Sequence, residues 1–264
     1  MKKISVNKKT LYVVESHNQV LEAWESCTRQ NVFSLDFHTD SREAFQNYSY
    51  WKADSEIKSG LYRDHEKRKK EIIDQKINQY LEKEITIKQI NDNLKNDEHL
   101  DFSVRVDMID TVFILSKNSN ASSSNPNVYI IDGRNNYRNQ RILEYSPPCI
   151  PGCEKSIHDE KCRYMRADSS LEDFVLDTAI ARAKNFKSSF FENYILDIDC
   201  DFFNTEKSLY PENFETFKKL IRESDFITIA LEPECVKICL LEGCRLNSEI
   251  ILSRLITIIE ESQI

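Results

Sequence analysis

The chain carries an imidazole between two carboxylates at a spacing that suits a divalent metal ion. A short, mainly apolar stretch at 33–35 leads into Asp36, His38 and Asp40, a D-x-H-x-D motif. Side chains of an extended segment alternate between faces, so these three point the same way. Carboxylates and imidazoles are common ligands of divalent metals. The motif therefore predicts a metal site at the end of a strand, and a solvated loop is the alternative for this motif taken alone.

A second apolar run, residues 194–201, carries Asp197, Asp199 and Asp201 at alternate positions. An apolar strand rarely keeps carboxylates on one face unless a positive charge compensates them. His17 follows another strand-like stretch and is a further candidate ligand, because ligands of open α/β sheets gather at the carboxyl ends of the strands.

A third group of candidate ligands, three thiols and an imidazole, lies in the sequence between the two carboxylate motifs. Three thiols and one imidazole could hold a structural zinc ion, although the spacing is not a common zinc-ribbon pattern. A redox disulfide and a loop with incidental cysteines are open alternatives. The candidate zinc ligands are Cys149, Cys153, His158 and Cys162.

The composition is that of a soluble globular protein, with 264 residues of which 30% are charged and 40% hydrophobic. The net charge of -8 argues against a general nucleic-acid binder. No apolar run approaches the ~20 residues of a membrane helix, and the first residues lack the apolar core of a signal peptide. We therefore expect a cytoplasmic protein without nucleic-acid or membrane partners. The four glycines form no phosphate-binding loop.

Strand-like runs alternate with helical patterns along the chain, which predicts an α/β fold with a mainly parallel sheet and helices on both faces. Residues 52–96 are highly charged, with Ile and Leu at helical spacing, and predict a helical insertion. We expect residues 1–264 to form a single domain. Strands are predicted at 10–15, 33–36, 112–115, 128–131, 194–201 and 226–231, and further helices at 20–27, 171–186, 214–221 and 250–259.

His17, the D-x-H-x-D motif and the pair Asp197 and Asp199 together resemble the dimanganese ligand set of the arginase/ureohydrolase superfamily. Residues 13–18, 96–101 and 196–203 resemble more closely a branch of arginase-like proteins. Some members of that branch are peptide arginases, which convert arginine to ornithine inside ribosomally made precursor peptides. The resemblance implies an arginase/deacetylase-like fold, two Mn²⁺ ions and a precursor peptide as partner.

The resemblance also implies how the six ligands are shared. Asp40 would orient the bridging hydroxide and accept its proton, and attack on a guanidinium would give urea and an amine. Asp36 and Asp197 would bridge the two ions. One ion would be held by His17, Asp36, Asp40 and Asp197, and the other by Asp36, His38, Asp197 and Asp199.

The chain departs from the arginase pattern at three places. The late motif is D-x-D-x-D, which leaves the role of Asp201 open. No His follows Asp40 where arginases carry a proton-shuttling His. His65 and His99 are the later candidates for that role, and we choose His99. Arginases bind the guanidinium with a Glu after a late strand, and aligning Pro233 would not put a Glu at that position. Glu232, which follows a late strand, is the candidate for binding the guanidinium, with a solvated carboxylate as the alternative.

Taken together, these features predict a manganese-dependent hydrolase that converts peptidyl-arginine to ornithine plus urea. Three other functions are open: hydrolysis of a small guanidino compound, deacetylase-like amide hydrolysis, and a non-catalytic binding module. The oligomeric state is not determined by the sequence.

Overall fold

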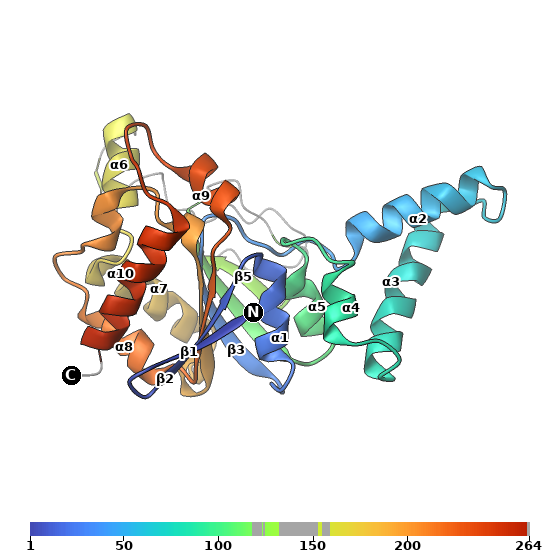
Figure 1. Ribbon diagram of the computed structural model, residues 1–264, viewed down its shortest axis with the longest axis horizontal. Coiled ribbons are helices and arrows are strands. Elements are labelled where there is room, and N and C mark those ends of the chain that lie inside the picture. The colour runs from blue at the N-terminus through green and yellow to red at the C-terminus, as the bar shows by residue number, and fades with distance from the viewer. Residues whose placement is uncertain (118–122, 124, 132–152, 155–158, 263–264) are drawn as a thin grey trace.

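A seven-stranded sheet forms the centre of the computed structural model, which describes residues 1–117, 123, 125–131, 153–154 and 159–262. The strand order across the sheet is β1-β2-β7-β6-β3-β4-β5 (Figure 1). The first two strands pair antiparallel, and all other neighbours pair parallel. The strands are β1 (Lys2–Val6), β2 (Lys9–Val14), β3 (Gln30–Asp36), β4 (Ile109–Ser116), β5 (Val128–Ile131), β6 (Tyr194–Asp199) and β7 (Ile227–Ala230).

The predicted mainly parallel α/β sheet is confirmed, and β1 is an addition to it. Its sequence opens with Lys2 and Lys3, and most of its residues are exposed, so it lacks the apolar signal of the other strands. A short, lysine-rich strand is typical of a sheet edge, where charge discourages pairing with another chain.

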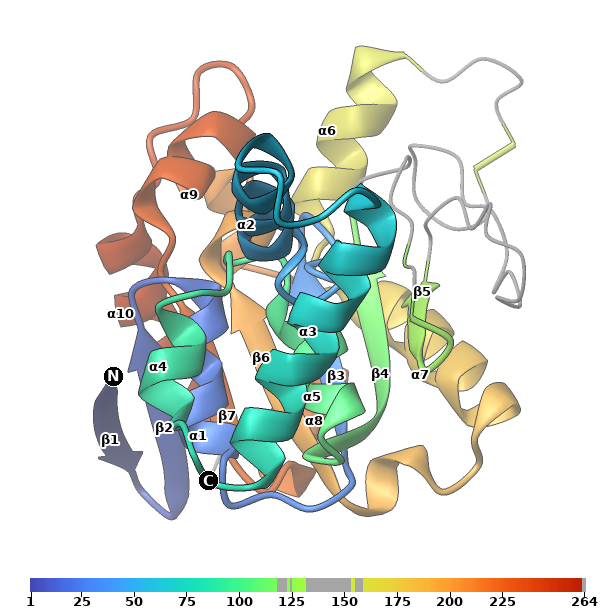
Figure 2. The same cartoon turned by 90° about the vertical axis from the view of Figure 1, so that its right-hand side faces the viewer.

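Helices cover both faces of the sheet (Figures 1 and 2). On one face lie α7 (Asp173–Phe186), α8 (Glu215–Glu223) and α10 (Ser248–Glu261). The other face is covered by the 3₁₀ helix η1 (His17–Val20), α1 (Leu21–Trp24), α4 (Ile87–Asn91) and α5 (His99–Arg105). Two further helices are α6 (Glu160–Asp168) and α9 (Pro233–Cys239).

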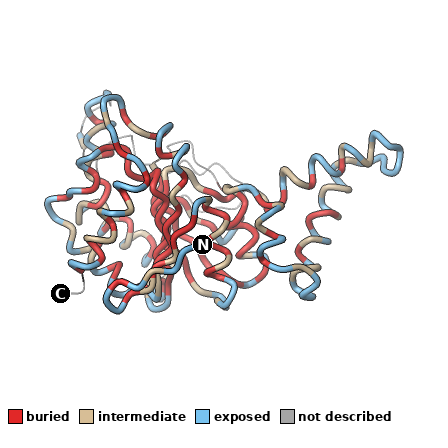
Figure 3. The backbone as a smooth tube through the Cα atoms, viewed as in Figure 1, coloured by how far each residue is buried: buried red, intermediate tan, exposed pale blue. Residues whose placement is uncertain are grey.

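Two apolar clusters, one on each side of the sheet, form the core. Phe33 and Leu35 of β3 belong to the cluster beneath α7, α8 and α10, whereas Val32 belongs to the cluster beneath α1 and α5. The central strands are therefore buried on both faces (Figure 3). Because side chains alternate, Asp36 shares the face of Val32, beneath α1 and α5.

The helical insertion predicted at 52–96 covers the second half of α2 (Gln46–Lys58) together with α3 (His65–Leu81) and α4, so its first helix begins earlier than predicted. The helices α2 and α3 pack together as a hairpin that projects away from the sheet (Figure 1). Asp64 caps α3 by accepting a hydrogen bond from the Lys67 backbone N–H. Trp51 and Leu61 on this hairpin are 68% and 73% exposed, so the hairpin presents apolar side chains to solvent.

Among the helices of the described residues, none combines the length and the apolar character needed to cross a membrane.

Candidate metal centre

Three carboxylates and an imidazole meet at the carboxyl edge of the central strands. Asp36 is the last residue of β3, and Asp199 is the last residue of β6. Leu35 of β3 pairs with Ile198 of β6, so Asp36 and Asp199 lie at the same height on neighbouring strands. The short turn after β3 brings Asp40 back to this edge with a left-handed backbone conformation, φ 42°.

His17 reaches the same point from β2, although β7 lies between β2 and β6. It is the first residue of η1, which packs against both β2 and β7. Gln19 Oε1 accepts hydrogen bonds from the backbone N–H groups of Glu15 and Ser16, which fixes the start of this turn. The residue of β7 beside Asp199 is Ala230, whose small side chain leaves room for the imidazole.

One ring nitrogen of His17 faces all three carboxylates. Its Nδ1 lies 2.8 Å from Asp40 Oδ2, 3.2 Å from Asp199 Oδ2 and 4.0 Å from Asp36 Oδ2. The four residues are buried, and each offers a ligand atom within 4.8 Å of the others. This group, His17, Asp36, Asp40 and Asp199, is called the first cluster below.

Several atoms of the first cluster have no hydrogen-bond partner among the described residues. They are His17 Nδ1, Asp36 Oδ2 and Asp40 Oδ2, all shielded from solvent. The 2.8 Å approach of His17 Nδ1 to Asp40 Oδ2 is an ion-pair contact that lacks the geometry of a hydrogen bond. Buried polar atoms are almost always hydrogen-bonded, so unsatisfied atoms that converge on one point need an explanation. A divalent cation satisfies carboxylate oxygens and an imidazole lone pair together, so the donor set fits a metal ion.

A second cluster lies beside the first one. His38 Nδ1 is 2.8 Å from Asp201 Oδ2, and Cys239 Sγ is 3.9 Å from the same oxygen. These three residues also offer ligand atoms within 4.8 Å of one another. The two clusters are linked through the backbone, because Asp36 Oδ1 accepts from the His38 N–H at 2.6 Å and Asp199 Oδ1 accepts from the Asp201 N–H at 3.1 Å.

Asp197, expected as a ligand shared by both ions, lies elsewhere. It is 2.9 Å from His17 Nε2, on the opposite side of the imidazole from the first cluster. Its carboxylate also accepts hydrogen bonds from Ser34 Oγ and Thr228 Oγ1. The late carboxylates that lie beside the D-x-H-x-D residues are therefore Asp199 and Asp201, whereas Asp197 groups with His17 and His99.

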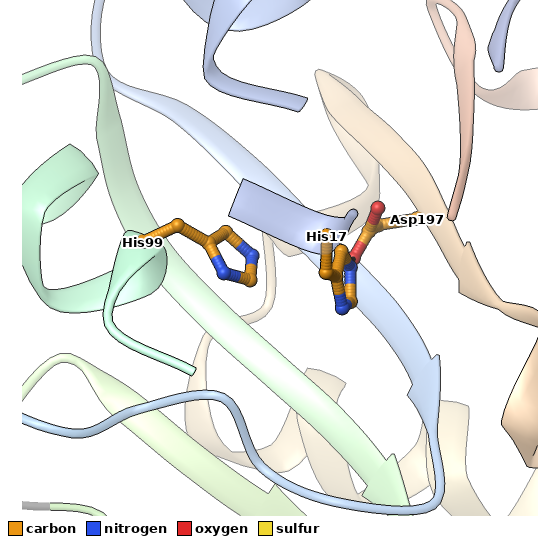
Figure 4. Close-up of side chains that lie close together, drawn as sticks. All are labelled: His17, His99 and Asp197. Atoms are coloured by element: carbon orange, nitrogen blue, oxygen red, sulfur yellow. Dashed lines mark hydrogen bonds and ion pairs between the residues drawn. The ribbon is translucent and has the colours of Figure 1, made fainter. Parts of the chain in front are cut away.

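His99, expected as a proton shuttle, is completely buried behind His17. The two rings have centroids 4.5 Å apart, and His17 lies between His99 and Asp197 (Figure 4). His99 Nδ1 donates to the Asn96 carbonyl, and Nε2 has no hydrogen-bond partner among the described residues. Burial and the nearby His17 lower the pKa of His99 to about 3. A neutral imidazole without solvent contact does not match the expected role.

Glu232, expected to bind a guanidinium, uses its carboxylate inside the protein. Its Oε1 accepts from the His17 backbone N–H at 2.8 Å, and Oε2 accepts from Asn96 Nδ2 at 2.9 Å. The residue adopts φ 36° just before Pro233, the first residue of α9. Glu232 therefore anchors the start of η1 and so the position of His17, instead of pointing a free carboxylate at a substrate.

Burial strongly affects protonation in the first cluster. It raises the pKa of Asp36 and of Asp199 well above the usual range, and neighbouring carboxylates add to the effect. Burial also raises the pKa of Asp40, to about 6, against the opposing effect of His17. His17 opposes this effect on each of the three carboxylates, so the protein compensates only part of the negative charge that they would carry when ionised.

The carboxylates also raise the pKa values of the two imidazoles that they contact, His17 and His38. Burial alone would lower the pKa of His17, but the Asp197, Asp199 and Asp40 carboxylates raise it well above 6.5. The hydrogen bond to Asp201 raises the pKa of His38 to about 9. The His38 side chain is 44% exposed, which makes it the solvent-facing member of the two clusters.

Two of the predicted zinc ligands, Cys149 and His158, lie outside the described residues. Cys162 is buried in α6, and Cys153 is half-buried. The structural zinc site formed by Cys149, Cys153, His158 and Cys162 stays a prediction.

Sequence reasoning did not identify several residues that build the site. Ser34, Thr228 and Asn96 donate hydrogen bonds to its carboxylates, and Cys239 adds a thiol from α9. No motif in the sequence marks these four residues as part of the site. Asp201 differs from them, because it continues the alternation of Asp197 and Asp199, although the sequence leaves its role open. Comparison of the chain with protein-family models, with curated proteins and with solved structures gives no match.

Proposed function

We propose that the protein is a manganese-dependent hydrolase of the guanidinium group, acting on arginine within a peptide to give ornithine and urea. The observation that carries the proposal is the first cluster, in which buried donor atoms without hydrogen-bond partners converge at the carboxyl edge of a parallel sheet. In open α/β sheets this edge is where ligands bind.

The proposed ligand set differs from the expected one at the late strand. His17 Nδ1, Asp40 and the shared Asp36 and Asp199 would hold one ion. The second ion would be held by His38 and Asp201, again together with the shared Asp36 and Asp199. The backbone links between the two clusters support this sharing, because the carboxylates of Asp36 and Asp199 accept N–H groups from His38 and Asp201.

The chemistry of the donors supports manganese over zinc. Carboxylate oxygens dominate the set, and the first cluster contains no thiol. Oxygen-rich donor sets suit Mn²⁺, whereas thiolates favour softer metals such as zinc. Within the two clusters, the thiol of Cys239 beside Asp201 is the donor that favours zinc.

The residues of the site would divide the hydrolytic work as follows. When bound, two divalent ions would lower the pKa of a water molecule and so supply the nucleophile at neutral pH. Asp40 Oδ2, which has no hydrogen-bond partner among the described residues, would orient that water and accept its proton. The hydroxide would add to the guanidinium carbon, and the proton would then pass to the side-chain nitrogen. Cleavage of the bond between that carbon and that nitrogen would release urea and leave ornithine in the peptide.

Two features support a peptide as the substrate. The hairpin of α2 and α3 begins six residues after Asp40 and offers exposed apolar side chains, Trp51 and Leu61 among them. Such side chains could hold an extended chain while one arginine enters the site. The net charge of -8 attracts a cationic substrate over long range, an effect that salt weakens.

Mass spectrometry tests the proposal directly. Arginine-containing peptides, free arginine, small guanidino compounds and acetyl-lysine peptides are incubated with the manganese-loaded protein. The expected result is loss of one cyanamide unit from the peptides, with urea formed in equal amount and a much lower rate on free arginine. The Asp36→Asn variant is the matched inactive control.

Each other outcome has a clear meaning. Release of acetate from acetyl-lysine would support amide hydrolysis, and faster turnover of free arginine or a small guanidino compound would replace the peptide as substrate. Binding of manganese without turnover of any substrate would support a non-catalytic module.

A further inference from the structure

The three carboxylates on strand β6 and its extension face two different environments. Asp199 belongs to the first cluster and Asp201 to the second, whereas Asp197 groups with His17 and His99 and lies one row further back in the sheet. Ser34 of β3, Asp197 of β6 and Thr228 of β7 are register partners on three adjacent strands. Their side chains therefore form one row across the same face of the sheet, and all three are buried.

This row saturates the Asp197 carboxylate with donors. Ser34 Oγ donates to Oδ2 at 3.0 Å, Thr228 Oγ1 donates to Oδ1 at 2.5 Å, and His17 Nε2 donates to Oδ2 at 2.9 Å. Neither oxygen of Asp197 is among the buried atoms without a hydrogen-bond partner, unlike an oxygen of Asp36 and of Asp40. Asp197 has what a buried carboxylate needs without any metal ion.

We infer that Asp197 is a positioning residue, fixed by Ser34 and Thr228, whose carboxylate holds the His17 ring with its Nδ1 directed at Asp36, Asp40 and Asp199. The inference rests on the proposed metal site, because Nδ1 is the atom that would bind an ion there. A carboxylate acting only as acceptor selects the form of His17 that carries a proton on Nε2. That leaves the Nδ1 lone pair for the metal.

The tilted His99 ring beside His17 completes this arrangement. Its centroid lies 4.5 Å from that of His17, and its Nδ1 is committed to the Asn96 carbonyl. His99 therefore limits the rotation of the His17 ring by contact, while Asp197 fixes its orientation by a hydrogen bond (Figure 4). The His17 backbone N–H is fixed separately by Glu232.

The first test uses the metal-free protein and nitrogen-15 NMR of the imidazoles. The wild type should show a slowly exchanging proton on His17 Nε2, identified by its loss in His17→Asn. Asp197→Asn should remove or strongly shift that signal and leave the His99 Nδ1 proton in place. Absence of a protected proton on His17 Nε2, or its persistence unchanged in Asp197→Asn, overturns the inference.

The second test titrates Mn²⁺ by calorimetry. Asp197→Asn should keep the wild-type number of ions and bind them about 10 to 100-fold more weakly, the usual effect of losing an outer hydrogen bond to a ligand. Loss of an ion equivalent, as expected for Asp199→Asn, would identify Asp197 as a ligand and overturn the inference. Unchanged affinity would also overturn it.

Thr228→Val and Ser34→Ala are milder variants that keep the Asp197 carboxylate. They replace Asp197→Asn in the Mn²⁺ titration if that variant does not fold. Each removes one donor and should weaken Mn²⁺ binding by a smaller factor at constant stoichiometry, and unchanged affinity in both would count against the inference. Failure of the wild type to bind any divalent ion would reject the proposed function alone. The NMR experiment would still decide whether Asp197 positions His17.

Discussion

His17 Nε2 lies 2.9 Å from Asp197, while Nδ1 of the same ring lies 2.8 Å from Asp40. One imidazole therefore separates a carboxylate that is saturated with protein donors from a group of carboxylates that is not. This division is the basis for proposing Asp36, Asp40 and Asp199 as metal ligands and Asp197 as a positioning residue, and the following predictions depend on it.

The shared carboxylates should be essential for both ions. Asp36→Asn and Asp199→Asn each remove an oxygen donor from the point where the two clusters meet. We expect the wild type to bind about two Mn²⁺ per chain, the number of a dinuclear site. Each variant should bind fewer and lose at least ~100-fold in activity, more than an outer hydrogen bond contributes. Elemental analysis after reconstitution measures the stoichiometry. A wild type with no metal, or with one tightly held zinc, would contradict the dinuclear site.

The second cluster should be separable from the first. His38→Ala and Asp201→Asn remove residues that are close to each other but distant in sequence. Both variants should drop from about two ions to about one, with the remaining ion held by the first cluster. Calorimetry with Mn²⁺ measures this change, and circular dichroism checks the fold. If Asp201→Asn keeps both ions, Asp201 is not a ligand.

Metal-free protein should lose stability as the pH rises. His17 and His38 have pKa values raised above 6.5, so their stabilising contribution is complete below that pH and is lost as the pH rises through the folded-state values. Asp36 and Asp199 also have raised pKa values, so the folded state holds their protons more tightly than the unfolded state does. Their contribution to stability is therefore lost as the pH rises, in the same direction as that of the two histidines.

Thermal unfolding in a chelator should therefore show a Tm that falls between about pH 6 and pH 9, the upper value being that of His38. Saturating Mn²⁺ should flatten the profile, because bound ions replace protons as partners of the carboxylates. A metal-free Tm that is constant or rises over this range would contradict the charge balance described for the first cluster.

His99 should act through packing and not through proton transfer. His99→Asn removes most of a completely buried ring, so we expect a loss of about 1–3 kcal/mol in the free energy of unfolding. Added imidazole should not rescue the activity of His99→Asn at a temperature well below Tm, because the position of His99 has no contact with solvent. Rescue, or a shifted pH profile of kcat, would restore the proton-shuttle hypothesis.

The exposed apolar residues of the α2–α3 hairpin should affect the hydrolysis of peptide substrates and not that of small guanidino compounds. Trp51→Ala should raise KM for an arginine-containing peptide about tenfold, the effect of losing one aromatic contact. The kcat/KM for a small guanidino compound should not change. Ile250→Ala is the matched control, since Ile250 is 45% exposed on α10, on the other side of the sheet. Equal effects on both substrates would place the peptide elsewhere.

The sequence by itself determined the fold class and the acidic and histidine residues of the two clusters, but not the hydroxyl, amide and thiol groups around them. Alternating apolar runs and helical patterns predicted the parallel sheet, because strand and helix periods are local properties. The D-x-H-x-D and D-x-D-x-D spacings predicted one strand face for each group, since side chains alternate with a period of two. These inferences need no knowledge of neighbouring strands. In the structure the strands end at Asp36 and Asp199, and His38, Asp40 and Asp201 follow in turns.

Only the tertiary structure decided which carboxylates meet. Alternation fixes the face of a strand but not the height along it, and the pairing of Ser34 with Asp197 sets that height for β6. This register puts Asp199 beside Asp36 and leaves Asp197 one row behind, next to hydroxyl groups from two other strands. The burial of His99 and the engagement of Glu232 likewise depend on distant residues, so no local pattern predicted them.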